Sequence, residues 1–270
     1  MGLFKKKNSE VKTDYISTNE MGFAVRESYK QLRTNLEFSL PDVEGCKIIG
    51  VTSAGKGEGK STTSIRLAGA LAEAQKRVLL IEGDLRLPTF RRRFGIKAKE
   101  GISDKLIRGG KELKINNIKL DKEENGASLD VVICGSTPPN PSEILGSDAM
   151  GALLNELKRK YDYILVDFPP ITLVSDTLAA SKFLHGVVMV VRQNFTETSD
   201  LAEAMMQLEF GRVKLLGFVY NCARGDEFSY RIRYKYRHRY YKYGGYKYGY
   251  HYGSYAAKQP NEETKEEEKK

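Results

Sequence analysis

Residues 47–67 of this chain are KIIGVTSAGKGEGKSTTSIRL. The apolar run at 47–52 predicts a strand, a glycine-rich loop follows it, and a helical pattern begins at Ser61. Within this stretch, residues 54–61 (AGKGEGKS) fit the P-loop pattern, with Ala54 in the first glycine position. Glycines let backbone N–H groups turn toward phosphates, and the helix N-terminus adds a favourable dipole. The stretch therefore predicts a phosphate-binding loop between a strand and a helix.

The side chains of this loop have distinct expected roles. We expect Lys60 to bridge the β- and γ-phosphates of a nucleotide and the Ser61 hydroxyl to bind Mg²⁺. A surface loop that merely contains Gly-Lys-Ser is the alternative, and the preceding strand, the following helix and acids farther along the chain disfavour it. The residues predicted to contact the nucleotide are Gly55, Lys56, Gly57, Glu58, Gly59, Lys60, Ser61 and Thr62.

Two acidic positions follow apolar runs downstream. Residues 79–86 (LLIEGDLR) place Glu82 and Asp84 at the end of one strand, and Asp167 ends another. Acids two residues apart lie on the same side of an extended chain. Acids at the carboxyl ends of parallel strands lie at the ligand-binding edge of a sheet. We expect these carboxylates to face the phosphate loop.

Short apolar runs alternate with helical patterns along the chain, which predicts an α/β fold with a mainly parallel sheet covered by helices on both faces. We predict a flexible N-terminus at 1–19, an ATP-binding domain at 20–227 and a disordered tail at 228–270. The predicted strands are 47–52, 77–82, 129–134, 163–167, 186–192 and 215–221. The predicted helices are 20–39, 61–75, 147–160, 176–184 and 199–210, with a short helix near 102–107 in a polar loop excursion at 95–128.

The tail holds most of the basic charge. Of the formal net charge of +9, residues 228–255 contribute +7, from seven Lys or Arg and no acids. Residues 256–270 contribute −1, which leaves +3 for residues 1–227. Few aliphatic residues interrupt the tail, so it has little with which to form a core. Its eleven tyrosines are Tyr230, Tyr234, Tyr236, Tyr240, Tyr241, Tyr243, Tyr246, Tyr248, Tyr250, Tyr252 and Tyr255.

Composition also limits the compartment. The three cysteines have no paired spacing, so we expect structural thiols in a reducing cytoplasm. No apolar run approaches the roughly 20 residues that span a bilayer. Membrane association is therefore expected to come from a partner or from surface charge.

Together these motifs resemble those of the bacterial tyrosine kinases, specifically the separate cytoplasmic subunit of capsular and exopolysaccharide systems. The resemblance rests on the P-loop, the strand-end acids with Arg86, residues 138–145 (PPNPSEIL), residues 161–170 (YDYILVDFPP) and the tyrosine tail. It extends from about residue 20 to residue 255. It implies a MinD/ParA-like P-loop NTPase fold and ATP-dependent autophosphorylation of the eleven tail tyrosines.

The resemblance also implies a role for each site residue. Lys60 would stabilise the transferring phosphate, Ser61 would hold Mg²⁺, and Asp84 and Asp167 would order the metal and its waters. Glu82 stands where the family has an Asp that is proposed to accept the tyrosine proton, and it is one methylene longer. Lys56 occupies a position that is commonly Pro in the family.

Partners follow from the same resemblance. It implies a transmembrane adaptor that activates the kinase at the inner face of the membrane, a ring-like homo-oligomer that phosphorylates in trans, and a cognate tyrosine phosphatase. Glu27, Lys30 and Arg33 resemble an assembly motif, with Lys30 in place of its first Arg. Arg192 and Asn221 resemble residues near the adenine base, and a purely structural role is the alternative for both.

Two other functions fit parts of the sequence. MinD/ParA-type positioning ATPases share the expected fold, but their signature lysine is replaced here by Ala54, and they lack a tyrosine-rich tail. A basic aromatic tail is also typical of single-stranded nucleic-acid binding by stacking. The nearly neutral domain offers no supporting groove, which disfavours nucleic acid as the partner.

Overall fold

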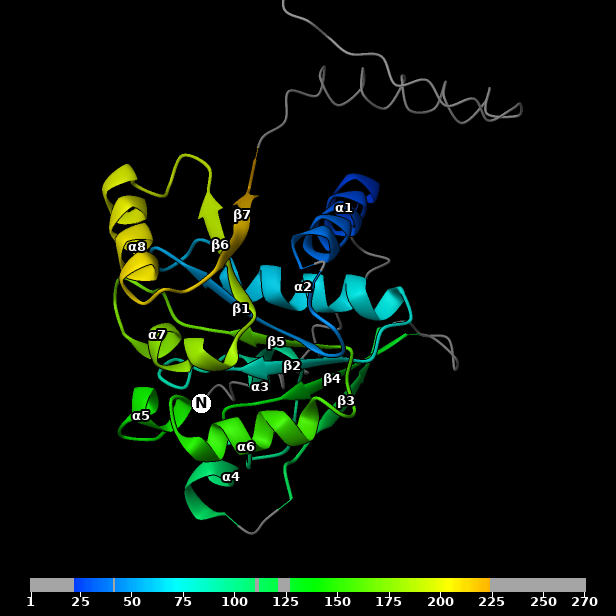
Figure 1. Ribbon diagram of the computed structural model, residues 1–270. Helices are drawn as coiled ribbons and strands as arrows, with labels where there is room; N and C mark the ends of the chain where they lie inside the picture. The colour runs from blue at the N-terminus through cyan, green and yellow to red at the C-terminus, as the bar shows by residue number, and fades with distance from the viewer. Residues whose placement is uncertain (1–21, 41, 110–111, 121–126, 224–270) are drawn as a thin grey trace, which may run out of the picture. The chain divides into compact units, whose positions relative to one another are not determined.

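The structure, a computed structural model, describes residues 22–40, 42–109, 112–120 and 127–223. Its centre is a seven-stranded sheet with the strand order β3-β4-β2-β5-β1-β6-β7 (Figure 1). β3 pairs antiparallel with β4, and every other neighbouring pair is parallel. The predicted mainly parallel α/β sheet is therefore confirmed. The strands are β1 (Lys47–Ser53), β2 (Val78–Glu82), β3 (Asn116–Lys119), β4 (Ser128–Val132), β5 (Tyr163–Asp167), β6 (Gly186–Arg192) and β7 (Leu215–Asn221).

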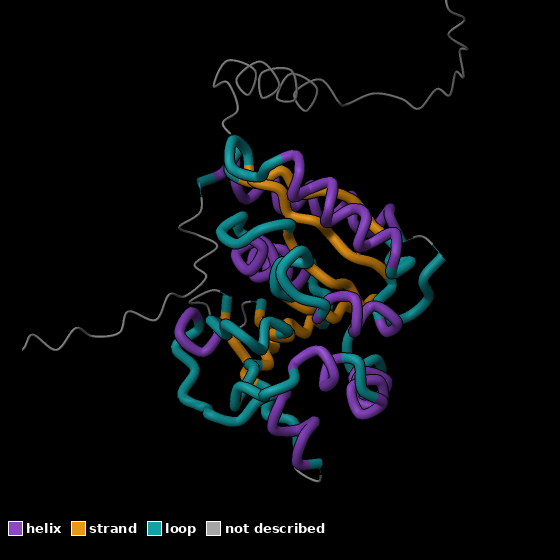
Figure 2. The backbone as a smooth tube through the Cα atoms, turned by 90° about the vertical axis from the view of Figure 1, so that its left-hand side faces the viewer, coloured by secondary structure: helices purple, strands orange, loops and turns teal. Residues whose placement is uncertain are grey.

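Helices cover both faces of the sheet (Figures 1 and 2). α1 packs on α2 on one side, and α6 lies on the other. The helices are α1 (Phe23–Ser39), α2 (Lys60–Glu73), α3 (Phe90–Arg93), α4 (Ile102–Arg108), α5 (Pro141–Leu145), α6 (Asp148–Leu157), α7 (Asp176–Ala180), the 3₁₀ helix η2 (Ser181–Phe183) and α8 (Thr198–Phe210).

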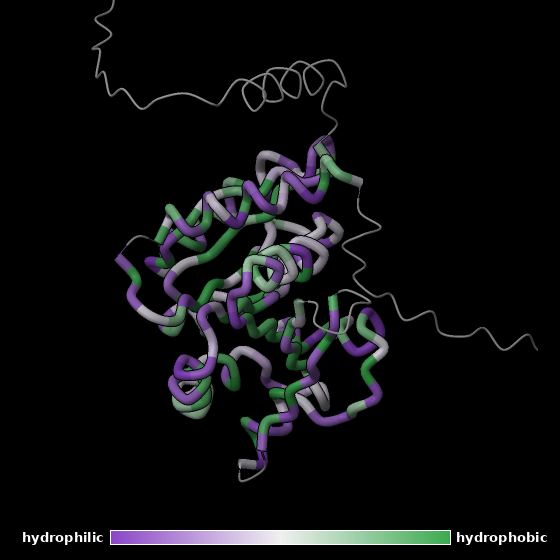
Figure 3. The backbone as a smooth tube through the Cα atoms, turned by 90° about the vertical axis from the view of Figure 1, so that its right-hand side faces the viewer, coloured by the Kyte–Doolittle hydropathy of each residue, from purple (hydrophilic) through white to green (hydrophobic). Residues whose placement is uncertain are grey.

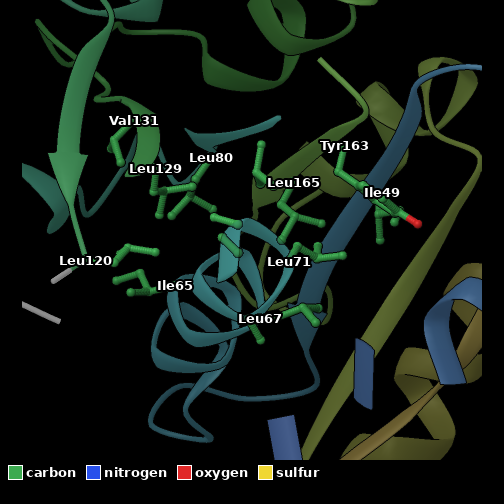
Figure 4. Packing of buried hydrophobic residues seen from close by; sticks show 14 of the residues in the cluster. Ile49, Ile65, Leu67, Leu71, Leu80, Leu120, Leu129, Val131, Tyr163 and Leu165 are labelled. Carbon is green, nitrogen blue, oxygen red and sulfur yellow. The ribbon is translucent and has the colours of Figure 1, made fainter. Parts of the chain in front are cut away.

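The strands contribute residues to three hydrophobic clusters, of which the smallest packs against α8. On one face Leu67 and Leu71 of α2 pack against Ile49, Leu80 and Leu165 of the strands (Figure 4). Both leucines are fully buried, so each truncation to Ala is expected to cost about 2–5 kcal/mol. The second core lies between the opposite strand faces and α6. In Figure 3 the helices alternate between hydrophilic and hydrophobic positions, which fits elements with one buried face.

The pairing of β5 with β1 and β2 aligns the carboxyl ends of these three strands. Asp167 at the end of β5 pairs with Val51 of β1 on one side and with Glu82 of β2 on the other. Because these three strands are parallel neighbours, the loops that follow them leave the sheet at the same edge. The sheet therefore brings the phosphate loop and both acidic positions together.

Several local predictions were incomplete. The polar excursion contains an edge strand, β3, which the sequence did not reveal because it is short and polar. The short helices α3, which starts two residues after Pro88, and α5, which begins at Pro141, were not predicted. The helix expected at 176–184 ends at Ala180 and continues as η2.

Some predictions lie outside the described residues. These are the flexible N-terminus at 1–19 and the disordered tail at 228–270. Within the part of the chain that the structure describes, none of the helices has the length and hydropathy needed to cross a membrane.

Candidate active site

The glycine-rich loop connects β1 to α2, as predicted. Gly57 and Gly59 adopt left-handed backbone conformations, with φ of 80° and 96°. A Cβ atom on Gly59 would collide with Nδ2 of Asn221. Glycine at 59 is therefore required both by backbone conformation and by the approach of Asn221. The first N–H groups of an α-helix have no partner within the helix, so those at the start of α2 suit the binding of phosphate.

Side chains from two other strands hold the loop in this shape. Arg192 Nη1 donates to the Gly57 carbonyl at 2.9 Å, and Asn221 Nδ2 donates to the Glu58 carbonyl at 2.8 Å. The Glu58 carboxylate, 1% exposed, accepts from the Gly55 N–H at 2.9 Å. The two residues expected near adenine thus fix the loop carbonyls. Their contact with adenine stays a prediction.

Phe195 also lies beside the loop, and it was not predicted as a site residue. The Arg192 guanidinium lies 4.6 Å from the centroid of its ring, which is half exposed. A Cβ on Gly57 would lie 3.4 Å from the ring. The two side chains therefore form a cation–π contact beside the loop. The surrounding sequence is polar and gave no signal for it.

Lys60 and Asp84 form an ion pair at the mouth of the loop. Lys60 Nζ lies 3.0 Å from Asp84 Oδ2 and 3.4 Å from Ser61 Oγ. Asp84 Oδ1 also accepts from the Leu87 N–H at 3.0 Å. The side chains of Lys60 and Asp84 are only 14% and 10% exposed, so water screens the pair weakly. The expectation that the strand-end acids face the loop is met for Asp84.

Asp167 ends β5 and interacts electrostatically with both members of this pair. It is 1% exposed, and Oδ1 accepts from Ser64 Oγ at 2.9 Å. Burial raises the pKa of Asp167, while the Lys60 charge and the hydroxyls of Ser61 and Ser64 lower it. The carboxylate thus sits within the electrostatic reach of both loop side chains.

Glu82 is placed differently from the other acids. It is 1% exposed, and its carboxylate accepts three backbone N–H groups. Oε1 accepts from Thr89 and, at 2.6 Å, from Phe90. Oε2 accepts from Cys134 at 2.9 Å. Burial raises the pKa of Glu82, and the three amide donors oppose that rise.

A second ion pair braces the segment that follows Asp84. Arg86 donates from Nε and Nη2 to the two carboxylate oxygens of Asp176, both at 3.0 Å. Asp176 is fully buried and also accepts from Ser142 Oγ at 2.6 Å. This Arg86–Asp176–Ser142 clamp joins the end of β2 to α5 and α7. Arg86 and the segment containing Ser142 belong to the sequence motifs described above, whereas their partner Asp176 was not predicted.

A cavity of about 520 Å³ lies next to the acidic strand end. Two exposed arginines, Arg91 and Arg92, contribute to its wall. Its lining residues are Glu82, Pro88, Arg91, Arg92, Gly95, Ile96, Ile133, Cys134 and Gly135.

The donor set fits a magnesium ion that is shared with a nucleotide. Among the described residues, no group of three or more His, Cys, Asp or Glu side chains is arranged to bind a metal alone. Mg²⁺ is usually held by one or two carboxylates together with phosphate oxygens and waters. Ser61, Asp84 and Asp167, gathered around Lys60, match that requirement.

Comparison with known proteins identifies the relatives of this arrangement. Residues 46–196 match the family model described as an AAA domain. The chain is 35% identical over 236 residues to the tyrosine-protein kinase YwqD of Bacillus subtilis, covering 87% of this chain and 96% of that protein. It is 32% identical over 216 residues to the putative tyrosine-protein kinase CapB of Staphylococcus aureus, covering 80% and 92%.

The chain belongs to the bacterial tyrosine kinases. The kinase domain of Escherichia coli ETK superposes with a TM-score of 0.68 at 28% identity, covering 92% of this chain and 88% of that one. The match to the full Escherichia coli etk protein spans 26% of its length. The Pyrococcus horikoshii septum site-determining protein MinD, at 23% identity and a TM-score of 0.53, shares the fold.

The kinase's candidate assembly residues all have partners within the chain. Lys30 pairs with Glu27 at 2.8 Å on the surface of α1. Arg33 Nη1 donates to the Ala70 carbonyl of α2 at 2.9 Å. The oligomer role of these residues stays a prediction. The eleven tail tyrosines lie outside the described residues.

Proposed function

We propose that this kinase uses ATP to phosphorylate its own C-terminal tyrosines, in trans within a homo-oligomer, and thereby regulates capsular or exopolysaccharide synthesis or export. The proposal rests on the position of Lys60, Asp84 and Asp167, which meet at one edge of the sheet. The same chain has eleven tyrosines between residues 230 and 255. The named relatives, which are tyrosine-protein kinases, support it.

The loop would hold the phosphates of ATP with its N–H groups, while Ser61, Asp84 and Asp167 would hold Mg²⁺. The bound ion neutralises developing charge on the phosphate oxygens. Lys60 adds a second positive charge, for which it must turn from Asp84 toward the phosphates. A tyrosine hydroxyl, with an ordinary pKa near 10, also needs a nearby proton acceptor.

The tail charge gives phosphorylation a physical consequence. Residues 228–255 carry +7, and each phosphate adds roughly −1.5 to −2. Four or five phosphates would thus cancel the charge. We propose that the unmodified tail docks on an acidic surface and that the phosphorylated tail leaves it. If liposome binding and oligomer size stay constant as the phosphotyrosine count rises, this switch is ruled out.

Partners complete the proposal. A transmembrane adaptor would recruit the kinase to the inner face of the membrane and activate it, and a cognate tyrosine phosphatase would reset the tail. Support comes from the resemblance to the capsular kinases and from the superposition on the chimerical protein CapA2B2, at a TM-score of 0.71 and 31% identity. Adding the cytoplasmic peptide of the adaptor should raise the phosphorylation rate.

Transfer between subunits can be tested with two full-length variants. The donor keeps its site but carries Phe at all eleven tail tyrosines, and the acceptor keeps its tail but carries Lys60→Met. The proposal predicts phosphotyrosine on the acceptor only when the donor and Mg·ATP are both present. A control acceptor carries Lys76→Met, at an exposed position, in place of Lys60→Met. It should phosphorylate its own tail tyrosines without a donor. An unmodified acceptor alongside an active wild type would contradict transfer in trans.

A further inference from the structure

We propose that Glu82 is a positioning residue, which closes the loop between β2 and α3 so that Asp84 faces Lys60, and that it does not take the tyrosine proton. The inference rests on the proposed kinase function and concerns the position at which this chain departs from its family. Here "the 83–88 loop" means the residues between Glu82 and Thr89.

The first step is the closure of the 83–88 loop. Oε1 of Glu82 accepts from the N–H groups of Thr89 and Phe90, seven and eight residues farther along. Glu82 directly precedes the 83–88 loop and Thr89 directly follows it. These hydrogen bonds therefore tie the two ends of the loop together. Phe90 is fully buried and packs edge to face on Phe94, so this far end is itself anchored in the core.

The second step is the attachment of Glu82 to the sheet. Oε2 accepts from the Cys134 N–H, two residues after the last β2–β4 backbone pair, Ile81 with Val132. On the other side, Gly83 N–H donates to the Asp167 carbonyl at 2.9 Å. The end of β2 is therefore tied to both neighbouring strands at the point where the 83–88 loop begins.

The third step connects this anchor to Asp84. Asp84 is the second residue of the 83–88 loop, and it bonds to Lys60 through Oδ2 and to the Leu87 N–H through Oδ1. With both loop ends fixed by Glu82, few backbone conformations remain that could turn Asp84 away from Lys60. Misplacement of a catalytic group by about 1 Å can cost on the order of 10²-fold in rate.

The same contacts argue against proton transfer to Glu82. A general base must come within hydrogen-bond reach of the proton it takes. Glu82 forms part of the cavity wall, yet it is 1% exposed, and its oxygens already accept three N–H groups. Oε1 already accepts from Thr89 and Phe90, so a tyrosine hydroxyl would have to displace a backbone donor to reach it.

The chain length of Glu explains the departure from Asp. The carboxylate must reach the Cys134 N–H, beyond the last β2–β4 backbone pair. It must also reach the N–H groups of Thr89 and Phe90 at the start of α3. An Asp at 82, one methylene shorter, cannot hold both sets of donors with the backbone in this position. The longer side chain is thus suited to an anchor.

Full-length Glu82→Gln and Glu82→Asp test the assignment, with Glu209→Gln at an exposed position as the matched control. Gln keeps an oxygen for Thr89 and Phe90 and loses only the acceptor for the Cys134 N–H, so we expect a rate within about tenfold of wild type. Asp should lose more than tenfold in kcat. A base at this position predicts the reverse: a loss of about 10²-fold or more for Gln, and for Asp a rate equal to wild type or higher. That reverse result would overturn the assignment.

Amide hydrogen exchange of the wild type provides a readout that needs no variant. The anchor predicts protection of the Thr89, Phe90 and Cys134 amides, and loss of that protection in Glu82→Asp. Rapid exchange of all three in the wild type contradicts the anchor. A wild type without phosphotyrosine defeats the kinase proposal instead, and the anchor is then still decided by the exchange data.

Discussion

The Lys60 ammonium and the Asp84 carboxylate lie 3.0 Å apart, so the lysine that should meet the phosphates is already paired. Lys60 comes from the start of α2 and Asp84 from the loop after β2, and the two meet because β5 alone separates β1 from β2. Phosphate must compete with this carboxylate for the lysine. A stronger Lys60–Asp84 pair should therefore weaken nucleotide binding, and bound nucleotide should weaken the pair.

Asp84→Asn removes the competitor. Without nucleotide, the mostly buried Lys60 loses its ion-pair partner, so the free energy of unfolding should fall by about 1–3 kcal/mol. ATP in the presence of EDTA should then raise the unfolding temperature more in the variant than in wild type, because no pair has to break. Equal shifts in the two proteins would show that the pair does not oppose phosphate. Phosphorylation by the variant should nevertheless be lost.

The Arg86–Asp176–Ser142 clamp should contribute strongly to stability. Asp176→Ala removes the buried acceptor of Arg86 and Ser142, and we expect a loss of about 1.5–3 kcal/mol, since Arg86 itself stays partly exposed to water. The control is Asp162→Ala, which breaks the exposed pair with Arg77 and should cost about 1 kcal/mol or less. Denaturant unfolding measures both. Similar losses would mean that burial of Asp176 does not set the strength of the clamp.

Gly59→Ala should abolish nucleotide binding. Its φ of 96° is unfavourable for Ala, and the new Cβ would collide with Asn221, which holds the loop carbonyl of Glu58. Gly69→Ala in α2 is the control, since its Cβ would make only ordinary contact at 3.9 Å. It should stabilise the protein by about 0.5–1 kcal/mol. Titration with a fluorescent ATP analogue measures nucleotide binding, and thermal unfolding measures stability. Normal nucleotide binding by the Gly59→Ala variant would contradict the loop geometry.

The cysteines should differ sharply in reactivity. Burial raises the pKa of Cys46 to about 11 and that of Cys134 to about 12, so both remain thiols at pH 8. Cys222 is exposed, so it lacks the burial expected of a structural thiol. Iodoacetamide at pH 8 should label Cys222 alone in the folded protein, and all three in denaturant. Peptide mass spectrometry reads the outcome, and early labelling of Cys134 would contradict its burial.

The sequence was sufficient to predict the site's main elements because their signals are local. The loop glycines, Lys60 and the strand-end acids each follow from short patterns, and parallel pairing then brings strand ends to one edge. The orientation of Glu82 was not predictable in this way. Its partners Thr89, Phe90 and Cys134 are set by tertiary packing, and the same is true of the bond from Asn221 to the loop.

The edge strand β3 illustrates the other limit. Asn116–Lys119 contains one aliphatic residue, and its burial alternates weakly, so hydrophobic patterning gave no strand signal. Its antiparallel pairing with β4 depends on backbone hydrogen bonds that any sequence can make.

The central claim is that Lys60 and its acidic neighbours catalyse phosphorylation of this chain's own tyrosines. Mass spectrometry of residues 228–255 after incubation with Mg·ATP tests it most directly, in wild type and Lys60→Met, with and without the adaptor's cytoplasmic peptide. We predict phosphotyrosine in wild type, at a higher level with the peptide, and none in Lys60→Met. Unmodified tyrosines in wild type under every condition would contradict the claim.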